Sequence, residues 1–286
     1  MKNLIASLLV AGTLAACSPA TDPDMLTKFI DDGESHPLII LLGGSEGGNY
    51  FANPDFDDIL LEYHEYGMSV AAMGYFRTKN TPRSPAEISL EVLDRRIATL
   101  ARNPAINENC IALVGFSKGA ELALLLGSHF DTATQVVAAF PSHVTWNAVR
   151  TPTSRSSWSL HGEPLAYINA PLFSFTMQSG NFTGEFVKAF TNALDKASSE
   201  EIEQARIPVE NIKGPVLLVS GKQDEIWPSY AMANAIEERL KQYGFAHPVE
   251  HIANEGGHYS YDSKTSDQVL RFLQSTLVEN CHNTAD

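Results

Sequence analysis

Basic residues are scarce in this sequence, and their scarcity excludes two classes of partner. The chain of 286 residues has 20 Lys and Arg against 34 Asp and Glu, which gives a formal net charge of −14. A chain with so negative a field does not attract nucleic acid or an anionic membrane surface. We therefore expect a small-molecule ligand and no nucleic-acid partner.

Motifs for cofactors and metals are also absent. The glycine-rich loop Gly43–Gly48 lacks the lysine and the spacing of a phosphate-binding loop, and the dinucleotide motif G-x-G-x-x-G is missing. No cluster of His, Cys or Asp has the spacing of metal ligands. The sequence thus predicts neither a metal nor an organic cofactor.

The first 17 residues have the features of an export signal. One basic residue and a short apolar run lead to Leu14-Ala-Ala-Cys17, and no later run approaches transmembrane length. This ending resembles the lipobox of bacterial lipoproteins, which implies cleavage before Cys17 and a lipid on that thiol; an ordinary secretory signal is the alternative. We expect a signal peptide over 1–16, a tether over 17–30, and an exported bacterial lipoprotein, periplasmic or on the cell surface, anchored to a membrane by its lipid.

The remaining chain, residues 31–286, alternates apolar runs with amphipathic stretches. Unbroken runs such as Leu38–Leu42 and Ile111–Val114 are typical of strands buried on both faces of a parallel sheet. The helical patterns between them predict an α/β domain, with a mostly parallel sheet and helices on both faces. From about 141 to 205 the periodicity is lost. Since so long an irregular stretch is usually functional, we expect it to form a cap over the strand ends.

The stretch Gly115–Gly127, GFSKGAELALLLG, carries the strongest chemical signal. It places Gly-x-Ser-x-Gly between an apolar run and a helical pattern, which is the strand–turn–helix context of a nucleophile elbow. Gly115 and Gly119 would let neighbouring backbone pass close to a tight turn. Ser117 is then the expected nucleophile, at the start of a helix whose free N–H groups favour negative charge.

An acid and a base follow in the order expected for such an elbow. Asp224 and His258 each lie just beyond the carboxyl end of a predicted strand. The order Ser–Asp–His is that of an α/β-hydrolase triad, in which His258 takes the proton of Ser117 and Asp224 orients the imidazole. Nearby residues leave alternatives open for the acid and the base: Glu225, Asp262 and His251.

Backbone N–H groups and cap aromatics complete the predicted site. The expected oxyanion donors are the N–H of Lys118, directly after the nucleophile, and one from the Gly43–Gly48 loop, with Ser45 as the candidate. The predicted cap has more aromatic side chains than an irregular surface loop needs. We expect some of them to line an acyl pocket: Trp146, Trp158, Phe173, Phe175 and Phe182.

Two cysteines besides Cys17 form an even pair in a chain expected to be exported. Cys110 immediately precedes the elbow strand, at the end of the sheet opposite Ser117. The last predicted helix starts near His258 and must run back to that same end, which brings Cys281 there. A disulfide between Cys110 and Cys281 and a pair of free thiols both remain open.

Several segments resemble the catalytic domain of the acyl-CoA thioesterase and bile acid-CoA:amino acid N-acyltransferase family: GFSKGAEL, GKQDEIWPS and GGHY, with LLGGSEGG and MGYF upstream. The similarity runs from about Leu38 to the last helix, and Lys118 and Trp227 make it more specific than Gly-x-Ser-x-Gly alone. It implies an α/β-hydrolase fold with a Ser–Asp–His triad. Serine at position 117, where the acyltransferase members usually have cysteine, favours transfer of the acyl group to water.

Two features depart from that family. The short segment between the tether and the first strand leaves out the family's N-terminal β-sandwich domain, and acyl-CoA is not expected where an exported enzyme works. We therefore expect a serine hydrolase that cleaves an acyl ester or thioester through an acyl-Ser117 intermediate. The alternatives are a carboxylesterase or dienelactone-hydrolase-like enzyme, an acyltransferase, and a non-catalytic, lipid-anchored binding lipoprotein.

Overall fold

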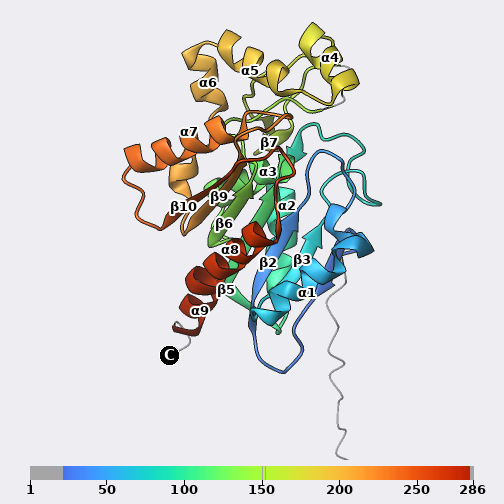
Figure 1. Ribbon diagram of the computed structural model, residues 1–286. Helices are drawn as coiled ribbons and strands as arrows, with labels where there is room; N and C mark the ends of the chain where they lie inside the picture. The colour runs from blue at the N-terminus through green and yellow to red at the C-terminus, as the bar shows by residue number, and fades with distance from the viewer. Residues whose placement is uncertain (1–21, 150, 152, 284–286) are drawn as a thin grey trace, which may run out of the picture.

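A seven-stranded sheet forms the centre of the molecule (Figure 1), in a computed structural model that describes residues 22–149, 151 and 153–283. In spatial order its strands are β1 (Met25–Lys28), β3 (Ser69–Met73), β2 (His36–Leu42), β5 (Ile106–Phe116), β6 (Gln135–Ala139), β9 (Val216–Gly221) and β10 (Val249–Asn254). Neighbouring strands are parallel except β1 and β3. The predicted mostly parallel sheet is confirmed. The predicted signal peptide and Cys17 lie outside the described residues.

Helices cover both faces of the sheet (Figure 1). One face packs against α1 (Asp57–Glu65), α8 (Ser263–Leu273), η4 (Gln274–Val278) and α9 (Glu279–Asn283). The other packs against α2 (Leu90–Ala101), α3 (Lys118–His129), η3 (Val209–Asn211) and α7 (Ser229–Gln242). Short turns η1 (Tyr50–Ala52) and η2 (Pro54–Phe56) precede α1. Among the described residues, no helix is long and apolar enough to cross a membrane.

Strand β2 shows why the central strands are unbroken apolar runs. Leu38, Ile40 and Leu42 belong to the core under α2, α3 and α7, whereas Ile39 and Leu41 belong to the core under α1 and α8. Successive side chains of a strand point to opposite faces, so a strand covered on both sides needs apolar residues at every position.

The N-terminal edge of the sheet begins earlier than predicted. Residues 25–28, which the sequence placed in the tether 17–30, form β1 and pair with β3. The strand has only four residues, all of them half-buried, and is therefore too short to show a period of two.

The cap, residues 141–205, is more regular than predicted. It contains α4 (Phe175–Thr183), α5 (Val187–Lys196) and α6 (Ser199–Ala205), which lie beyond the carboxyl ends of the strands (Figure 1). It also supplies β7 (Trp158–Leu160) and β8 (Glu163–Pro164), which form a small sheet with β4 (Ile88–Ser89). These helices have 9, 10 and 7 residues, and such short elements give little periodicity in a sequence window.

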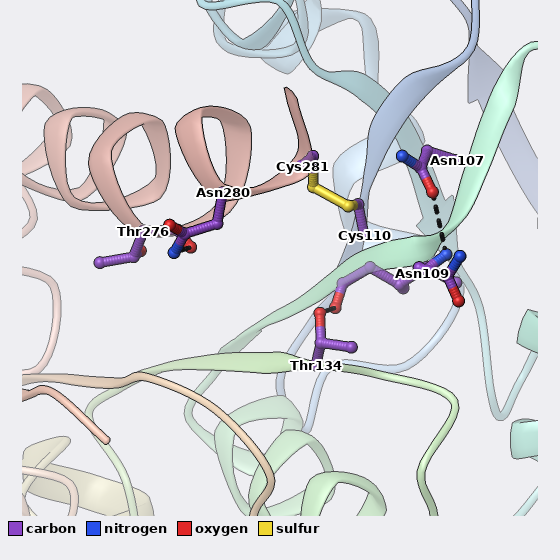
Figure 2. The surroundings of a disulfide bond; sticks show 8 residues. Asn107, Asn109, Cys110, Thr134, Thr276, Asn280 and Cys281 are labelled. Carbon is purple, nitrogen blue, oxygen red and sulfur yellow. Dashed lines mark hydrogen bonds between the residues drawn. A yellow bond between two sulfur atoms is a disulfide. The ribbon is translucent and has the colours of Figure 1, made fainter. Parts of the chain in front are cut away.

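A disulfide bond joins Cys110 in β5 to Cys281 in α9, with the two Cα atoms 6.0 Å apart (Figure 2). Both cysteines are buried, at the end of the sheet where β5 begins. Helices α8 and α9 run back along the sheet and bring Cys281 to this end (Figure 1). Of the two states left open for these cysteines, the structure has the bridge.

The double variant Cys110→Ala/Cys281→Ala is expected to unfold more easily than the wild type. The bridge closes a loop of 171 residues, and its loss should lower the free energy of unfolding by about 3–5 kcal/mol in the chain-entropy model. Guanidinium titrations with and without reductant measure this difference. Reductant should shift the midpoint of the wild type and leave that of the double variant unchanged; a wild type insensitive to reductant contradicts the prediction.

Candidate active site

The turn between β5 and α3 holds Ser117 in a strained conformation, with φ 56° and ψ −116°. Glycines on either side make the turn possible. A Cβ on Gly115 would lie 2.1 Å from the carbonyl oxygen of Gly119, and one on Gly119 would lie 2.2 Å from that of Leu42. The strand–turn–helix arrangement predicted for this motif is therefore present, and it projects Ser117 beyond the carboxyl end of β5.

Ser117, His258 and Asp224 form one hydrogen-bonded chain. His258 Nε2 lies 2.9 Å from Ser117 Oγ, and His258 Nδ1 lies 2.8 Å from Asp224 Oδ2. Only 2% of His258 and 6% of Asp224 is exposed, so little water competes for these contacts. Three residues predicted from separate segments are thus brought together with the geometry of a Ser–His–Asp triad.

The alternative acids and base lie elsewhere. Glu225 Oε2 accepts the backbone N–H of His258 at 3.0 Å and makes no hydrogen bond to the ring. Asp262 caps α8 by accepting the N–H of Thr265 at 2.9 Å. His251, on β10, is hydrogen-bonded through its two ring nitrogens to side chains of β9 and α7. The ring of His258 is thus bonded to Asp224 and to neither alternative acid, and Ser117 is bonded to His258 and not to His251.

The carboxylate of Asp224 is fixed by the loop that carries it. Its Oδ1 accepts the backbone N–H groups of Ile226 at 2.9 Å and Trp227 at 3.1 Å. The indole Nε1 of Trp227 donates in turn to the carbonyl oxygen of Phe140, after β6. Both oxygens of this fixed carboxylate face the imidazole, with Oδ1 3.0 Å and Oδ2 2.8 Å from His258 Nδ1.

The predicted oxyanion donors flank the serine. Ser45 lines the same cavity as Ser117, and Lys118 is the first residue of α3. Within the described ranges, the backbone N–H groups of Ser45 and Lys118 donate to no protein acceptor. Both groups are therefore available to an oxygen atom that develops negative charge beside Ser117.

Glu46 is a carboxylate in the site that sequence reasoning missed. Its Oε1 accepts the N–H of Gly44 at 2.7 Å, and the residue lines the cavity above Ser117. Burial raises the pKa of Glu46, against the opposing influence of the Gly44 N–H group and of His258. A lone glutamate in a glycine-rich turn usually lies in solvent, so no sequence signal identified it.

The side chain of Lys118 points into the protein, away from the cavity. Its Nζ lies 2.9 and 2.8 Å from the two carboxylate oxygens of Glu121, and both side chains are buried. Burial lowers the pKa of the Lys118 ammonium group, although Glu121 opposes the shift. Glu121 Oε1 also accepts the indole N–H of Trp158 at 2.7 Å and the backbone N–H of Trp146 at 3.1 Å. This pair therefore ties the nucleophile helix to the cap.

A cavity of about 390 Å³ lies above Ser117 and His258. Its wall is largely apolar, with contributions from Phe116, Leu172, Met177, Phe186, Phe190 and Tyr259. This size and lining suit a small organic ligand. No group of three or more His, Cys, Asp or Glu side chains in the described part of the chain is placed to hold a metal ion.

The prediction of which cap aromatics line the cavity is wrong. Trp146 and Trp158 are fully buried behind it, and the other three candidates, Phe173, Phe175 and Phe182, are 76%, 88% and 90% exposed. The cavity instead takes its cap aromatics from α5 and the residue before it, Phe190 and Phe186. The sequence could not separate these sets, because the docking of α5 depends on backbone hydrogen bonds to the distant Glu225.

The sheet order, the elbow and the cap define an α/β hydrolase. Solved structures with this fold include an acylaminoacyl peptidase in complex with Z-Gly-Gly-Phe-chloromethyl ketone, with TM-score 0.58, 15% identity, and coverage of 89% of this chain and 39% of that one. An esterase of Pyrococcus furiosus has TM-score 0.55 and 17% identity, with 87% and 86% covered. At such identities the likeness shows the fold alone.

The chain belongs to the family described as BAAT / Acyl-CoA thioester hydrolase C terminal, whose model matches residues 88–261. Human acyl-coenzyme A thioesterase 6 is 25% identical over 237 residues, which cover 80% of this chain and 49% of the relative. Mouse acyl-coenzyme A amino acid N-acyltransferase 2 is 28% identical over 220 residues, with 76% and 47% covered. The chain thus spans about half the length of these curated relatives. The family suggested by the sequence motifs is confirmed.

Proposed function

We propose that this protein is a serine hydrolase that cleaves an acyl ester or thioester through an acyl-Ser117 intermediate. The observation that carries the proposal is the hydrogen-bonded chain from Ser117 through His258 to Asp224, beneath a largely apolar cavity. The names of its relatives, which include thioesterases and an N-acyltransferase, support chemistry at an acyl carbonyl.

Acylation follows from the positions of these groups. Ser117 Oγ attacks the carbonyl carbon while its proton passes to His258 Nε2, and Asp224 stabilises the imidazolium through Nδ1. The oxyanion of the tetrahedral intermediate accepts the N–H groups of Ser45 and Lys118. The bond from carbon to the leaving oxygen or sulfur then breaks, and His258 returns its proton to the leaving group.

Deacylation repeats the sequence with water as nucleophile. Water gives a proton to His258 Nε2 and attacks the acyl-Ser117 carbonyl, and the same two N–H groups stabilise the second oxyanion. Breakage of the bond to Ser117 Oγ releases the carboxylic acid, and the proton returns to the serine. Both halves of the reaction thus use the triad, water and the two backbone N–H groups.

A substrate panel on the purified protein without residues 1–17 tests the proposal. We expect covalent labelling of Ser117 by a fluorophosphonate probe, and turnover of p-nitrophenyl esters or acyl thioesters of matched chain length. Preference for esters indicates a carboxylesterase or dienelactone-hydrolase-like enzyme, and faster product formation with an added amine acceptor indicates an acyltransferase. A protein that neither reacts with the probe nor turns over any substrate contradicts the proposal and favours the non-catalytic, binding alternative.

We also propose that the protein is exported and anchored through lipid on Cys17. The support is the lipobox-like end of residues 1–17, together with the Cys110–Cys281 disulfide, since such bonds persist in oxidising compartments. Metabolic labelling with a radioactive fatty acid tests this. The wild type should be labelled and sediment with membranes, and Cys17→Ser should abolish both; labelling that survives the substitution contradicts the proposal.

Phe190→Ala is expected to weaken the binding of long acyl chains. Phe190 lines the cavity from α5, and loss of its ring should raise KM for an octanoyl or longer ester about tenfold while KM for an acetyl ester changes little. Phe175→Ala is the matched control, because its ring is 88% exposed on the same cap. Equal effects of Phe190→Ala on both substrates mean that Phe190 only packs the cap.

A further inference from the structure

A buried hydroxyl group contacts the loop that carries the Ser45 N–H group. Tyr75, two residues past β3, is 2% exposed, and its hydroxyl lies 2.7 Å from the carbonyl oxygen of Gly43 and 3.0 Å from that of Gly44. One hydroxyl proton thus serves two successive carbonyl groups in a three-centre hydrogen bond. The mechanism above makes no use of Tyr75.

Holding these carbonyl groups also sets the direction of two N–H groups. In a planar trans peptide, the C=O of one residue points opposite to the N–H of the next. The carbonyl of Gly43 therefore orients the N–H of Gly44, and the carbonyl of Gly44 orients the N–H of Ser45, both away from Tyr75. The first of these meets Glu46 Oε1 at 2.7 Å, and Ser45 itself lines the cavity.

The loop lies directly against the nucleophile and needs such restraint. A Cβ on Gly44 would be 3.3 Å from the Cβ of Ser117 and 2.8 Å from the Glu46 carboxylate. A side chain at position 44 would crowd Ser117, but two successive glycines give the backbone many alternative conformations. A rotated peptide between Gly44 and Ser45 would direct a carbonyl oxygen, in place of an N–H group, toward the developing oxyanion.

The surroundings of Tyr75 fix its ring. Its ring centroid lies 5.2 Å from that of Phe76 and 5.8 Å from that of Trp158. The Trp158 indole is bonded to Glu121, which pairs with the Lys118 ammonium group, so the Tyr75 ring packs against the buried network of the nucleophile helix. Burial, reinforced by Glu46 and Glu121, raises the pKa of Tyr75 well above its usual value. The hydroxyl therefore stays protonated and remains a donor.

We propose that Tyr75 is a positioning residue of the oxyanion hole: its hydroxyl holds the Gly43 and Gly44 carbonyls so that the Ser45 N–H faces the oxyanion. The inference rests on the proposed function, because an oxyanion forms only if Ser117 attacks an acyl group. It assigns to Tyr75 a role in the stability of the transition state, with no contact to substrate.

The Tyr75→Phe variant tests this role, because it removes one hydroxyl and keeps the ring packing. We expect kcat to fall about 10–100-fold, somewhat less than for a donor lost outright, while KM changes less than about threefold. The affinity for an acyl trifluoromethyl ketone, which forms an oxyanion on Ser117, should fall by the same factor as kcat/KM. The rate of fluorophosphonate labelling should fall in parallel, and it can be measured without a substrate.

Tyr66→Phe is the matched control, since the Tyr66 hydroxyl donates to Asp267 Oδ1 at 3.3 Å on α8. It should leave kcat and ketone affinity unchanged. A Tyr75→Phe variant with wild-type kcat, or with lower kcat but unchanged ketone affinity, overturns the assignment while the wild type stays active. A wild type that neither turns over esters nor reacts with fluorophosphonate overturns the proposed function, and this inference with it.

Discussion

Ser117→Ala is expected to lower kcat for ester or thioester hydrolysis by about 10⁴-fold or more, because no other member of the Ser117–His258–Asp224 triad can form the acyl intermediate. His258→Ala should have an effect of similar size. Since the members act as a unit, the double variant Ser117→Ala/His258→Ala should be no slower than either single variant. Steady-state measurement of kcat for the three variants checks this.

Two matched controls separate this effect from general damage. Ser128 is a buried serine within α3, bonded to the carbonyl oxygen of Leu124, and Ser128→Ala should keep wild-type kcat. His251→Ala should also keep it, since His251 does not reach Ser117. If Ser117→Ala keeps activity within tenfold of the wild type, the nucleophile lies elsewhere. A fluorophosphonate probe that labels nothing in the Ser117→Ala sample excludes a contaminating serine hydrolase as the source of that activity.

The sheet and the positions around the serine could be predicted because their signals are local. The part of a strand that is covered on both faces must be apolar, so Leu38–Leu42 of β2 and Ile111–Val114 of β5 appear as unbroken runs. The close approach of α3 to the backbone of Leu42 requires glycine at 119, so the elbow appears as a motif. Parallel strands end at one edge of the sheet, which is why Ser117 and His258, 141 residues apart along the sequence, could be assigned to one site.

The rest of the site depends on contacts that no local pattern encodes. Tyr75 meets the loop at Gly43 and Gly44 only after β2 and β3 have paired. The bond of Glu46 to Gly44 is local, but the place of Glu46 in the cavity wall beside Ser117 exists only in the folded protein. A tyrosine at the end of a buried strand is usual in a core, and nothing in its neighbours shows that the hydroxyl meets two carbonyl groups. The contribution of α5 to the cavity likewise needs the docked cap.

The Lys118–Glu121 pair left a signal that could have been used. The two residues are three apart in a helix that is otherwise almost entirely apolar, so they lie on the same face. Two opposite charges in a helix that must be buried indicate an internal ion pair. The identity of the partners Trp146 and Trp158, however, follows only from the fold of the cap.

Asp224→Asn is expected to lower kcat by about 10⁴-fold, as a wrong histidine tautomer does in this kind of triad. The structure supplies the reason. Oδ1 of Asp224 accepts the N–H groups of Ile226 and Trp227, so an asparagine keeps its carbonyl oxygen there. Its NH₂ group then takes the place of Oδ2, which at 2.8 Å is the nearer of the two oxygens to His258 Nδ1. An imidazole that accepts this NH₂ group at Nδ1 carries its own proton on Nε2. In that tautomer Nε2 cannot take the proton of Ser117.

Glu225→Gln is the matched comparison, one residue along the same loop. Glu225 Oε2 accepts only the backbone N–H of His258, and a glutamine oxygen can accept the same bond, so kcat should stay within about tenfold of the wild type. Steady-state kinetics on both variants, with thermal unfolding to check their stability, decide between the two carboxylates. A nearly normal kcat for Asp224→Asn together with an inactive Glu225→Gln would assign the acid to Glu225. The bond from the His258 backbone N–H to Glu225, and not the bond from His258 Nδ1 to Asp224, would then control the imidazole.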